Sequence, residues 1–230
     1  MENKTNLENS GRRRFLGKLA AAGLVSMAPG FDVLANQKTE SFSPSSDPEE
    51  IFKKITGKHR VVFDAPKPHE IYPFAWPRVF LLTNEMTGTG NKDCSVMVVL
   101  RHAAIGYAME DRLWAKYNLG EVFQANDPET GKPATRNPFW KPRPGAYKVP
   151  GVGELLIGVD QLQANGVLFC VCEAAMTVYS AVVAGKMNMD AKDIKNEWVS
   201  GILPGIQPVP SGVWALGRAQ EHKCAYIFAG

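Results

Sequence analysis

The fold of this chain is most constrained by one short apolar segment, Gly166-Val167-Leu168-Phe169-Cys170-Val171-Cys172-Glu173. The run after the glycine is rich in β-branched and aromatic residues, and it is too short to form a helix of ordinary length. Helix-like patterns flank it on both sides, which is typical of an interior strand in a parallel sheet. The segment therefore predicts an α/β fold in which Cys172 ends a buried strand.

Cys172 is a candidate for chemistry because ligands of open α/β sheets bind at the carboxyl ends of the strands. A free cysteine is also a small, usually buried hydrophobe, and this structural interpretation stays open for Cys172 and is favoured for Cys170. Residues two apart on a strand share a face, so we expect both thiols to point the same way. They are too far apart to bond to each other, whereas Cys94 or Cys224 could pair with either one.

The composition indicates one soluble globular domain. The chain has 230 residues, of which 45% are hydrophobic and 21% are charged. Most of the net charge of +3 comes from the N-terminal 35 residues, since residues 36–230 carry 21 basic and 20 acidic side chains. This near balance argues against nucleic acid as a partner.

The N-terminus has the three parts of a secretory signal. Gly11-Arg12-Arg13-Arg14-Phe15-Leu16 precedes a moderately apolar run, and small residues follow at a cleavage point that we expect after Ala35. Adjacent arginines before Phe-Leu are similar to a twin-arginine signal, which predicts export of the folded protein to the periplasm by the twin-arginine translocase. The apolar run is too short for a stable membrane span. An uncleaved amphipathic arm is the alternative.

The rest of the chain alternates strands with helices, after a polar linker at residues 36–57. Besides 166–172, strands are expected at 58–64, 95–100, 206–210 and 224–228. Helices are expected at 77–86, 105–117, 154–165, 174–187 and 190–200, with a last helix starting after Ser211. This alternation predicts a single three-layer α/β/α domain over 58–230 with a largely parallel five-stranded sheet. Pro208 and Pro210 indicate an edge strand.

The second strand ends at Arg101 and His102, the position that Cys172 has in its own strand. If the two strands are neighbours, His102 and Cys172 would face one crevice, where His102 could activate the thiol or act as acid and base. The alternative is a histidine that only caps the strand by a backbone hydrogen bond. The helix start at Ser211 and Gly212 offers N–H groups to an anion, and Arg101 is a further candidate contact for an anion or substrate.

Residues 123–150 form an irregular insertion with six prolines. Connections of this length are usually lids or binding arms. One interpretation is a lid that places Arg136 over an anionic ligand. The interpretation that we favour is a surface arm whose aromatic residues bury against its own domain or a neighbouring subunit. These residues are Phe139, Trp140 and Tyr147.

Several segments together resemble the DsrE-like family, in their order and spacing. They are Gly166 to Cys172, Leu203-Pro204-Gly205-Ile206, Val209 to Leu216, Ala219-Gln220-Glu221 and Cys224-Ala225-Tyr226-Ile227. The resemblance implies an α/β/α fold with a largely parallel five-stranded sheet and frequent homo-oligomers. Some members carry persulfide sulfur on a cysteine in sulfur oxidation or relay. Cys172 matches the position where many members have a cysteine after the Gly-Val strand, and His102 matches a histidine that ends the second strand.

The leading hypothesis is a periplasmic sulfur-handling protein in which Cys172 accepts or carries sulfur with the help of His102. Its partner would be a sulfur donor or acceptor protein or a small sulfur compound, and a sulfurtransferase-like activity is left open. The alternative is a non-catalytic oligomeric binding module. A metal site of Cys170, Cys172, His102 and either Cys94 or Cys224 is disfavoured by the C-x-C spacing, so we expect no metal and no cofactor.

Overall fold

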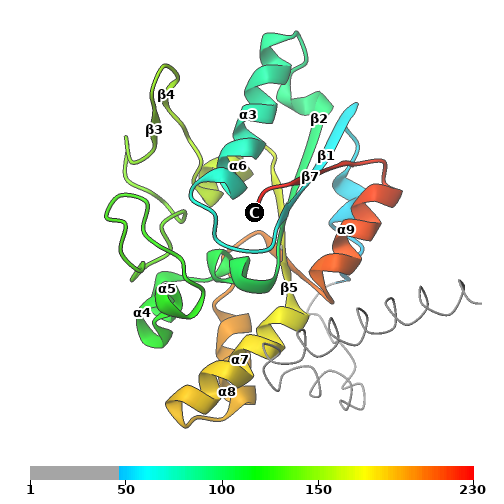
Figure 1. Cartoon of the computed structure of the whole chain (residues 1–230). Helices are drawn as coiled ribbons and strands as arrows, with labels where there is room; N and C mark the ends of the chain where they lie inside the picture. Colours follow the sequence, from blue (N-terminus) through cyan, green and yellow to red (C-terminus); the bar gives the residue numbers. More distant parts are fainter. Residues whose placement is uncertain (1–46) are drawn as a thin grey trace, which may run out of the picture. The chain divides into compact units, whose positions relative to one another are not determined.

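The computed structural model describes residues 47–230, so the expected signal peptide and the first half of the linker lie outside the described residues (Figure 1). Five strands form one sheet in the order β6-β5-β2-β1-β7, and every neighbouring pair is parallel. The strands are β1 (His59–Ala65), β2 (Cys94–Leu100), β5 (Leu168–Cys172), β6 (Ile206–Val209) and β7 (Ala225–Phe228). The expected five-stranded sheet is therefore confirmed, with the proline-containing β6 at an edge.

Helices occupy most of the connections between these strands. The longer ones are α3 (Tyr72–Met86), α7 (Glu173–Met187), α8 (Ala191–Ser200) and α9 (Gly212–Glu221). Shorter helices are α4 (Asp111–Tyr117), α5 (Leu119–Val122) and α6 (Val159–Ala164), with single 3₁₀ segments η1 (Phe52–Lys54), η2 (Asn91–Asp93) and η3 (His102–Ala108). A small antiparallel pair, β3 (Lys148–Val149) and β4 (Gly153–Glu154), lies apart from the main sheet. None of the helices within residues 47–230 is long and apolar enough to span a membrane.

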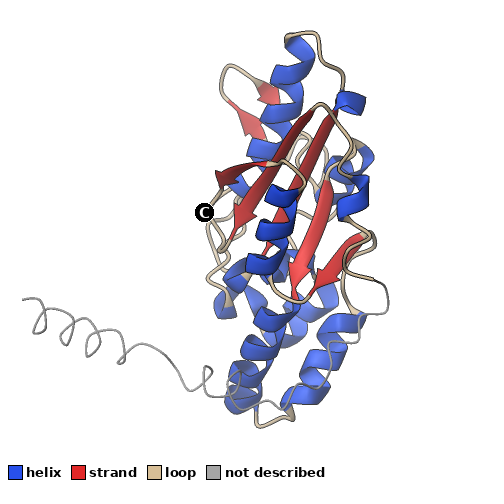
Figure 2. Cartoon of the chain, turned by 90° about the vertical axis from the view of Figure 1, so that its right-hand side faces the viewer, coloured by secondary structure: helices blue, strands red, loops and turns tan. Residues whose placement is uncertain are grey.

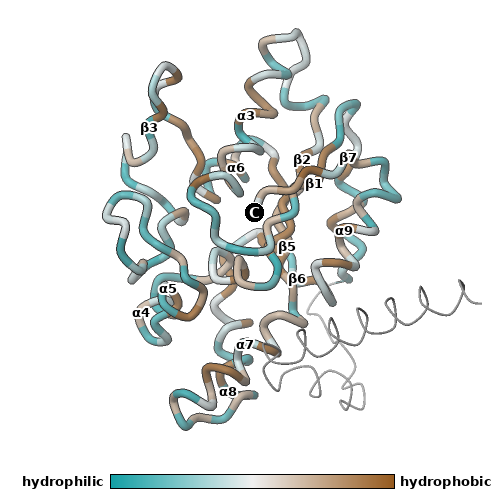
Figure 3. The backbone as a smooth tube through the Cα atoms, viewed as in Figure 1, coloured by the Kyte–Doolittle hydropathy of each residue, from teal (hydrophilic) through white to brown (hydrophobic). Residues whose placement is uncertain are grey.

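Each face of the sheet has its own hydrophobic cluster, which makes the fold three-layered. The larger cluster joins Phe63 and Val98 of the sheet to Phe74 of α3 and to the helices that follow. The smaller cluster joins Val99 to Ala215 and other residues of α9 on the opposite face. β2 is buried on both faces, and its sequence is continuously apolar from Val96 to Leu100; Figure 3 draws the strands of the sheet mainly brown.

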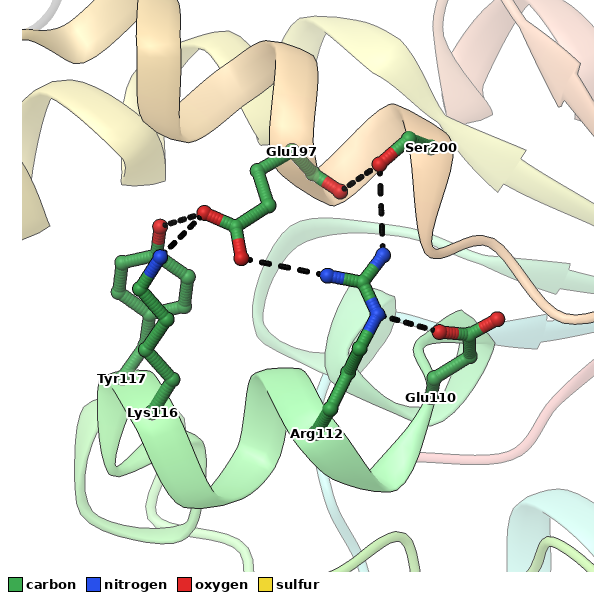
Figure 4. Close-up of polar contacts among 6 residues, drawn as sticks. All are labelled: Glu110, Arg112, Lys116, Tyr117, Glu197 and Ser200. Carbon is green, nitrogen blue, oxygen red and sulfur yellow. Dashed lines mark hydrogen bonds and ion pairs between the residues drawn. The ribbon is translucent and has the colours of Figure 1, made fainter.

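The helices α7 and α8 pack against each other beyond the carboxyl ends of the strands, as Figures 1 and 2 both show. A polar cluster centred on Glu197 of α8 connects this pair to α4 (Figure 4). The Glu197 carboxylate accepts hydrogen bonds from Lys116 Nζ at 2.6 Å, the Tyr117 hydroxyl at 2.6 Å and Arg112 Nη1 at 3.2 Å. Arg112 also contacts the two other residues drawn, Glu110 and Ser200.

The insertion packs on its own domain, as the favoured interpretation expected. Phe139 is fully buried, and its ring stacks on that of Phe74 in α3 with 4.1 Å between centroids. The Tyr147 ring stacks on the other side of Phe139 at 5.2 Å, and its hydroxyl donates to the Pro138 carbonyl at 2.6 Å. Most of residues 123–150 has no regular structure, because buried aromatic rings rather than a hydrogen-bond ladder hold it in place.

Two expected helix starts were wrong. α3 begins at Tyr72 rather than Pro77, since Pro73 lies in the first turn, where its missing N–H costs nothing. Pro77 lies inside the helix and removes one backbone hydrogen bond. The helix expected from residue 154 starts only at Val159, because the Leu155 N–H donates to the Tyr147 carbonyl at 2.8 Å.

The expected helix at 105–117 is divided in two. η3 ends at Ala108, and α4 begins at Asp111. Between them the chain turns extended, with a bridge from Met109 to Ile202 and a hydrogen bond from the Glu110 N–H to the Gly201 carbonyl at 2.9 Å. Tertiary pairing with the segment after α8 therefore overrides the local helical pattern.

The polar cluster at Glu197 makes stability depend on pH. Hydrogen bonds from Lys116 and then Tyr117 lower the pKa of the Glu197 carboxyl from its usual value of 4.5. A carboxyl with a lowered folded-state pKa stabilises the fold fully above the unfolded pKa, and this stabilisation is lost as pH falls through the folded pKa. We expect Glu197→Gln to lower the free energy of unfolding by about 1 kcal/mol near pH 7. Urea denaturation of the variant and the unmodified protein, at neutral and at acidic pH, measures this difference in the free energy of unfolding.

The matched control is Glu85→Gln, which changes an exposed carboxyl on α3. We expect this control to unfold like the unmodified protein at both pH values. A Glu197→Gln effect that is equally large well below pH 4.5 would contradict the explanation by charge.

Candidate functional site

The helices that follow β5 and β6 lie on opposite faces of the sheet. The chain leaves β5 into α7, which contributes Met176 and Val183 to the larger cluster. It leaves β6 into α9, which contributes Ala215 and Ala219 to the cluster on the opposite face. Neighbouring parallel strands whose following helices lie on opposite faces define the topological switch point, where ligands of open α/β sheets bind.

Cys172 lies at this switch point. It is the last residue of β5, pairs in register with Val209 of β6, and is the N-cap of α7. Its Sγ accepts the backbone N–H of Ala175 at 3.3 Å, and the residue is 6% exposed. The N-terminal end of a helix attracts negative charge, so this position suits an anionic sulfur.

Cys170 is in a different environment from Cys172. It is fully buried in the cluster beneath α9, and burial raises the pKa of its thiol far above the usual value. Cys172 packs into the cluster on the other side of the sheet. The expectation that both thiols point to the same face of the sheet was therefore wrong. Cys172 is the last residue of the strand and the N-cap of a helix, so the alternation of side chains between the two faces of the sheet no longer applies to it. The structural interpretation of Cys170 is confirmed.

Arg101 and Asp64 form an ion pair at the carboxyl ends of β2 and β1. Arg101 Nε and Nη2 donate to the two carboxylate oxygens of Asp64 at 2.7 and 2.9 Å. The Tyr226 hydroxyl of β7 donates to the same carboxylate at 2.8 Å. Asp64 is 1% exposed, so these donors compensate a charge that would be very costly to bury alone.

Arg101 links this ion pair to Cys172. Its pKa is raised chiefly by the hydrogen bond to Asp64, and the charges of Tyr226 and Cys172 contribute in the same direction. Among the described residues, Nη1 of Arg101 has no hydrogen-bond partner, which leaves it available to a ligand. The stem of Arg101 packs on the start of α9, where a Cβ at Gly212 would lie 2.4 Å from the Arg101 Cβ. We call Asp64, Arg101, Cys172 and Tyr226 the strand-end cluster.

His102 follows Arg101 of this cluster in the chain, and its ring contacts Tyr179. β2 and β5 are neighbours, as the hypothesis of a shared crevice requires. The His102 backbone has a positive φ of 48°, and its ring nitrogens lie 3.3 and 3.4 Å from the Tyr179 hydroxyl of α7. Partial burial, and then the charge of Arg101, lower its pKa, so the ring is neutral near pH 7. No hydrogen bond joins His102 to Cys172 among the described residues.

The other expected contacts fall in two places. Ser211 is the N-cap of α9, as expected, and its hydroxyl accepts the Trp214 N–H at 3.2 Å, so Ser211 and Gly212 border the switch point. Arg136 is in the insertion, where its charge acts on Glu129 and Tyr147. The structure therefore brings Arg101, Ser211 and Gly212 toward Cys172, while Arg136 belongs to another part of the surface.

Sequence reasoning missed Asp64 and Tyr226. Asp64 was treated only as the end of the first strand, and Tyr226 only as part of the last. The available signal was a carboxylate directly after Val61-Val62-Phe63, since a charge at the end of a buried strand requires a partner. The identity of that partner depends on the order β2-β1-β7 in the sheet.

All four cysteines are free thiols in this structure, including Cys94 and Cys224. Within residues 47–230, no group of three His, Cys, Asp or Glu side chains lies close enough to hold a metal ion. The metal site considered from Cys170, Cys172 and His102 therefore has no geometric support in the part of the chain described.

Comparisons with known proteins identify neither a family nor an activity for this chain. No family model matches the chain, and no curated protein matches it. A solved structure of a protein of unknown function from Methanobacterium thermoautotrophicum is similar at 18% identity, with a TM-score of 0.35. The similarity covers 74% of this chain and 98% of that protein.

The close contact between Gly212 and Arg101 can be tested by adding one methyl group at Gly212 through substitution by alanine. We expect Gly212→Ala to lower the free energy of unfolding by about 1–3 kcal/mol, because its Cβ would overlap the Arg101 stem. Gly217→Ala is the control in the same helix, since a Cβ there meets no atom within 4 Å. It should be neutral or stabilising by up to about 1 kcal/mol. Urea denaturation of both variants measures this, and equal stability of the two would contradict the packing argument.

Proposed function

We propose that the protein is an exported sulfur-handling protein of the DsrE-like type, in which Cys172 accepts and carries one sulfane sulfur atom. The observation that carries the proposal is the position of Cys172 at the switch point, with its Sγ at the N-terminus of α7 and Arg101 in electrostatic range. The resemblance of the segments around Cys172 to the family supports the same residue.

The proposed step is a transfer of sulfur between thiols. The Cys172 thiolate attacks the terminal sulfur of a donor persulfide, R–S–SH. The S–S bond of the donor breaks, a new S–S bond forms at Sγ, and the donor leaves as a thiolate that takes up a proton. The overall oxidation state is unchanged, so no further oxidant or reductant is needed. The reverse reaction with an acceptor thiol releases the sulfur.

The neighbouring groups would stabilise the charges of this step. A persulfide is a stronger acid than a thiol, so the loaded Cys172 is an anion. The α7 N-terminus and Arg101 Nη1 are suited to hold that anion, and the backbone N–H groups that follow Ser211 face the same switch point. His102, with its lowered pKa, would be a neutral acceptor or carrier for the proton of the arriving or leaving thiol.

Mass spectrometry of the folded protein tests the proposal. After treatment with glutathione persulfide, we expect a mass increase of one sulfur atom on Cys172. Cys172→Ser should abolish the adduct, and Cys224→Ser, which changes another buried thiol, should keep it. Arg101→Gln should slow the transfer about tenfold, equivalent to roughly 1.4 kcal/mol of lost stabilisation. An unmodified Cys172 in the folded protein would refute a sulfur-carrying role.

Export is part of the same proposal, although the signal lies outside the described residues. Because the twin-arginine translocase reads the adjacent arginines, replacing Arg12 and Arg13 by lysine should retain the protein in the cytoplasm. Cell fractionation in a bacterium that has this pathway measures it. Periplasmic protein in undiminished amount would show that the protein is exported by another route.

The second candidate function is a non-catalytic binding module that assembles with copies of itself. The edge strand β7 favours it, because Tyr226, Ile227 and Phe228 are 46%, 38% and 53% exposed. The opposite edge, β6, is protected from further pairing by Pro208, whereas β7 has neither proline nor charge. Pairing of two β7 edges would bury these side chains and would fit the expected homo-oligomer.

A further inference from the structure

A hollow of about 510 Å³ lies apart from Cys172, between the loop after β1 and the insertion. Its volume falls in the range of sites that bind small molecules. The loops that form it follow β1 and β2 at their carboxyl ends, where open α/β sheets place ligand contacts. Its polar lining includes Glu70, Tyr107, Gln124, Asn126 and Asp127.

The lining of the hollow is acidic. Glu70 and Asp127 contribute carboxylates, and none of the lining residues is a lysine or arginine. Asp127 Oδ1 accepts the N–H groups of Glu129 at 2.8 Å and Thr130 at 3.3 Å, which fixes the carboxyl group in its loop. Oδ2 of Asp127 has no hydrogen-bond partner among the residues described. Oδ1 therefore holds the carboxylate in its loop, and Oδ2 is left free for a ligand.

The two arginines of the insertion lie near Glu129. The guanidinium of Arg143 pairs with Glu129, whose pKa is lowered chiefly by this hydrogen bond. The charge of Arg136 lowers the same pKa further. The charge of Arg143 also interacts with Asp127, so Glu129 compensates only part of the positive charge nearby.

Tyr107 adds a hydroxyl that can bond a ligand in the hollow. It lines the hollow and is only 2% exposed, and the rings of Phe74, Trp114 and Phe139 surround it. Within residues 47–230 its hydroxyl has no hydrogen-bond partner, and this oxygen is not among the fully buried polar atoms, so it keeps some solvent access. Burial raises the pKa of Tyr107, so the hydroxyl stays neutral. A neutral hydroxyl can accept a hydrogen bond from an ammonium group.

A metal ion does not fit this set of groups, because the described residues contain no group of three His, Cys, Asp or Glu that could hold one. The two amides of Gln124 and Asn126 add further hydrogen-bonding groups to the lining. We propose that the hollow binds a small organic cation with a primary ammonium group, held by the Asp127 carboxylate and the Tyr107 hydroxyl. This site is separate from the sulfur-carrying role proposed for Cys172.

Three probes of equal length and different charge test the proposal by isothermal titration calorimetry on the full chain. We expect 1,4-diaminobutane to bind saturably, 1,4-butanediol to bind about tenfold more weakly or less, and succinate not to bind. No saturable binding of the diamine, or equally strong binding of succinate or the diol, would overturn the proposal.

Two variants locate the binding. Asp127→Asn keeps the Oδ1 acceptor for the loop but removes the charge, so it should weaken diamine binding about tenfold. Tyr107→Phe should weaken it about three- to tenfold, because only the hydroxyl is lost. Asp193→Asn, an exposed acid in the first turn of α8, is the matched control and should bind like the unmodified protein. Unchanged binding in Asp127→Asn would show that the diamine binds elsewhere and would overturn the assignment.

Discussion

The ion pair between Asp64 and Arg101 organises the carboxyl edge of the sheet. A carboxylate buried at the end of β1 is stable only with close donors, and these come from the residue after β2 and from Tyr226 of β7. The same Arg101 stem packs on Gly212 at the start of α9. One buried charge thus ties together three strands and a helix, and it keeps a cation fixed in electrostatic range of Cys172.

The two cysteines of β5 show that the position of a thiol in the fold, rather than its residue type, determines its surroundings. Cys170 lies within the strand, fully buried among apolar side chains that disfavour its thiolate. Cys172 lies two residues later, where the strand ends and a helix begins, and its sulfur already accepts a backbone N–H. The following helices of β5 and β6 lie on opposite faces of the sheet, which is the arrangement at which open α/β sheets bind ligands.

The insertion and the α7–α8 pair both follow the carboxyl ends of the strands, and each is anchored to another helix by its own side chain. Phe139 anchors the insertion on α3, and Glu197 anchors α8 on α4. The anchored insertion forms one wall of the acidic hollow, whose floor is Tyr107. The edge therefore offers two candidate sites, one around the Arg101–Asp64 ion pair and Cys172 and one around Asp127. They are built on different loops, so each can be altered without the other.

The sequence by itself determined the five strands, the parallel sheet, the edge position of β6, the N-cap at Ser211 and the placement of Cys172 and Arg101 at strand ends. These depend on local apolar patterns and turn chemistry, which neighbouring residues carry. Only the tertiary structure decided that Asp64 and Tyr226 hold Arg101, that His102 contacts Tyr179, and that Arg136 lies away from Cys172. Such pairings join residues far apart in the chain, and the order of the strands, which no local pattern encodes, sets which side chains meet.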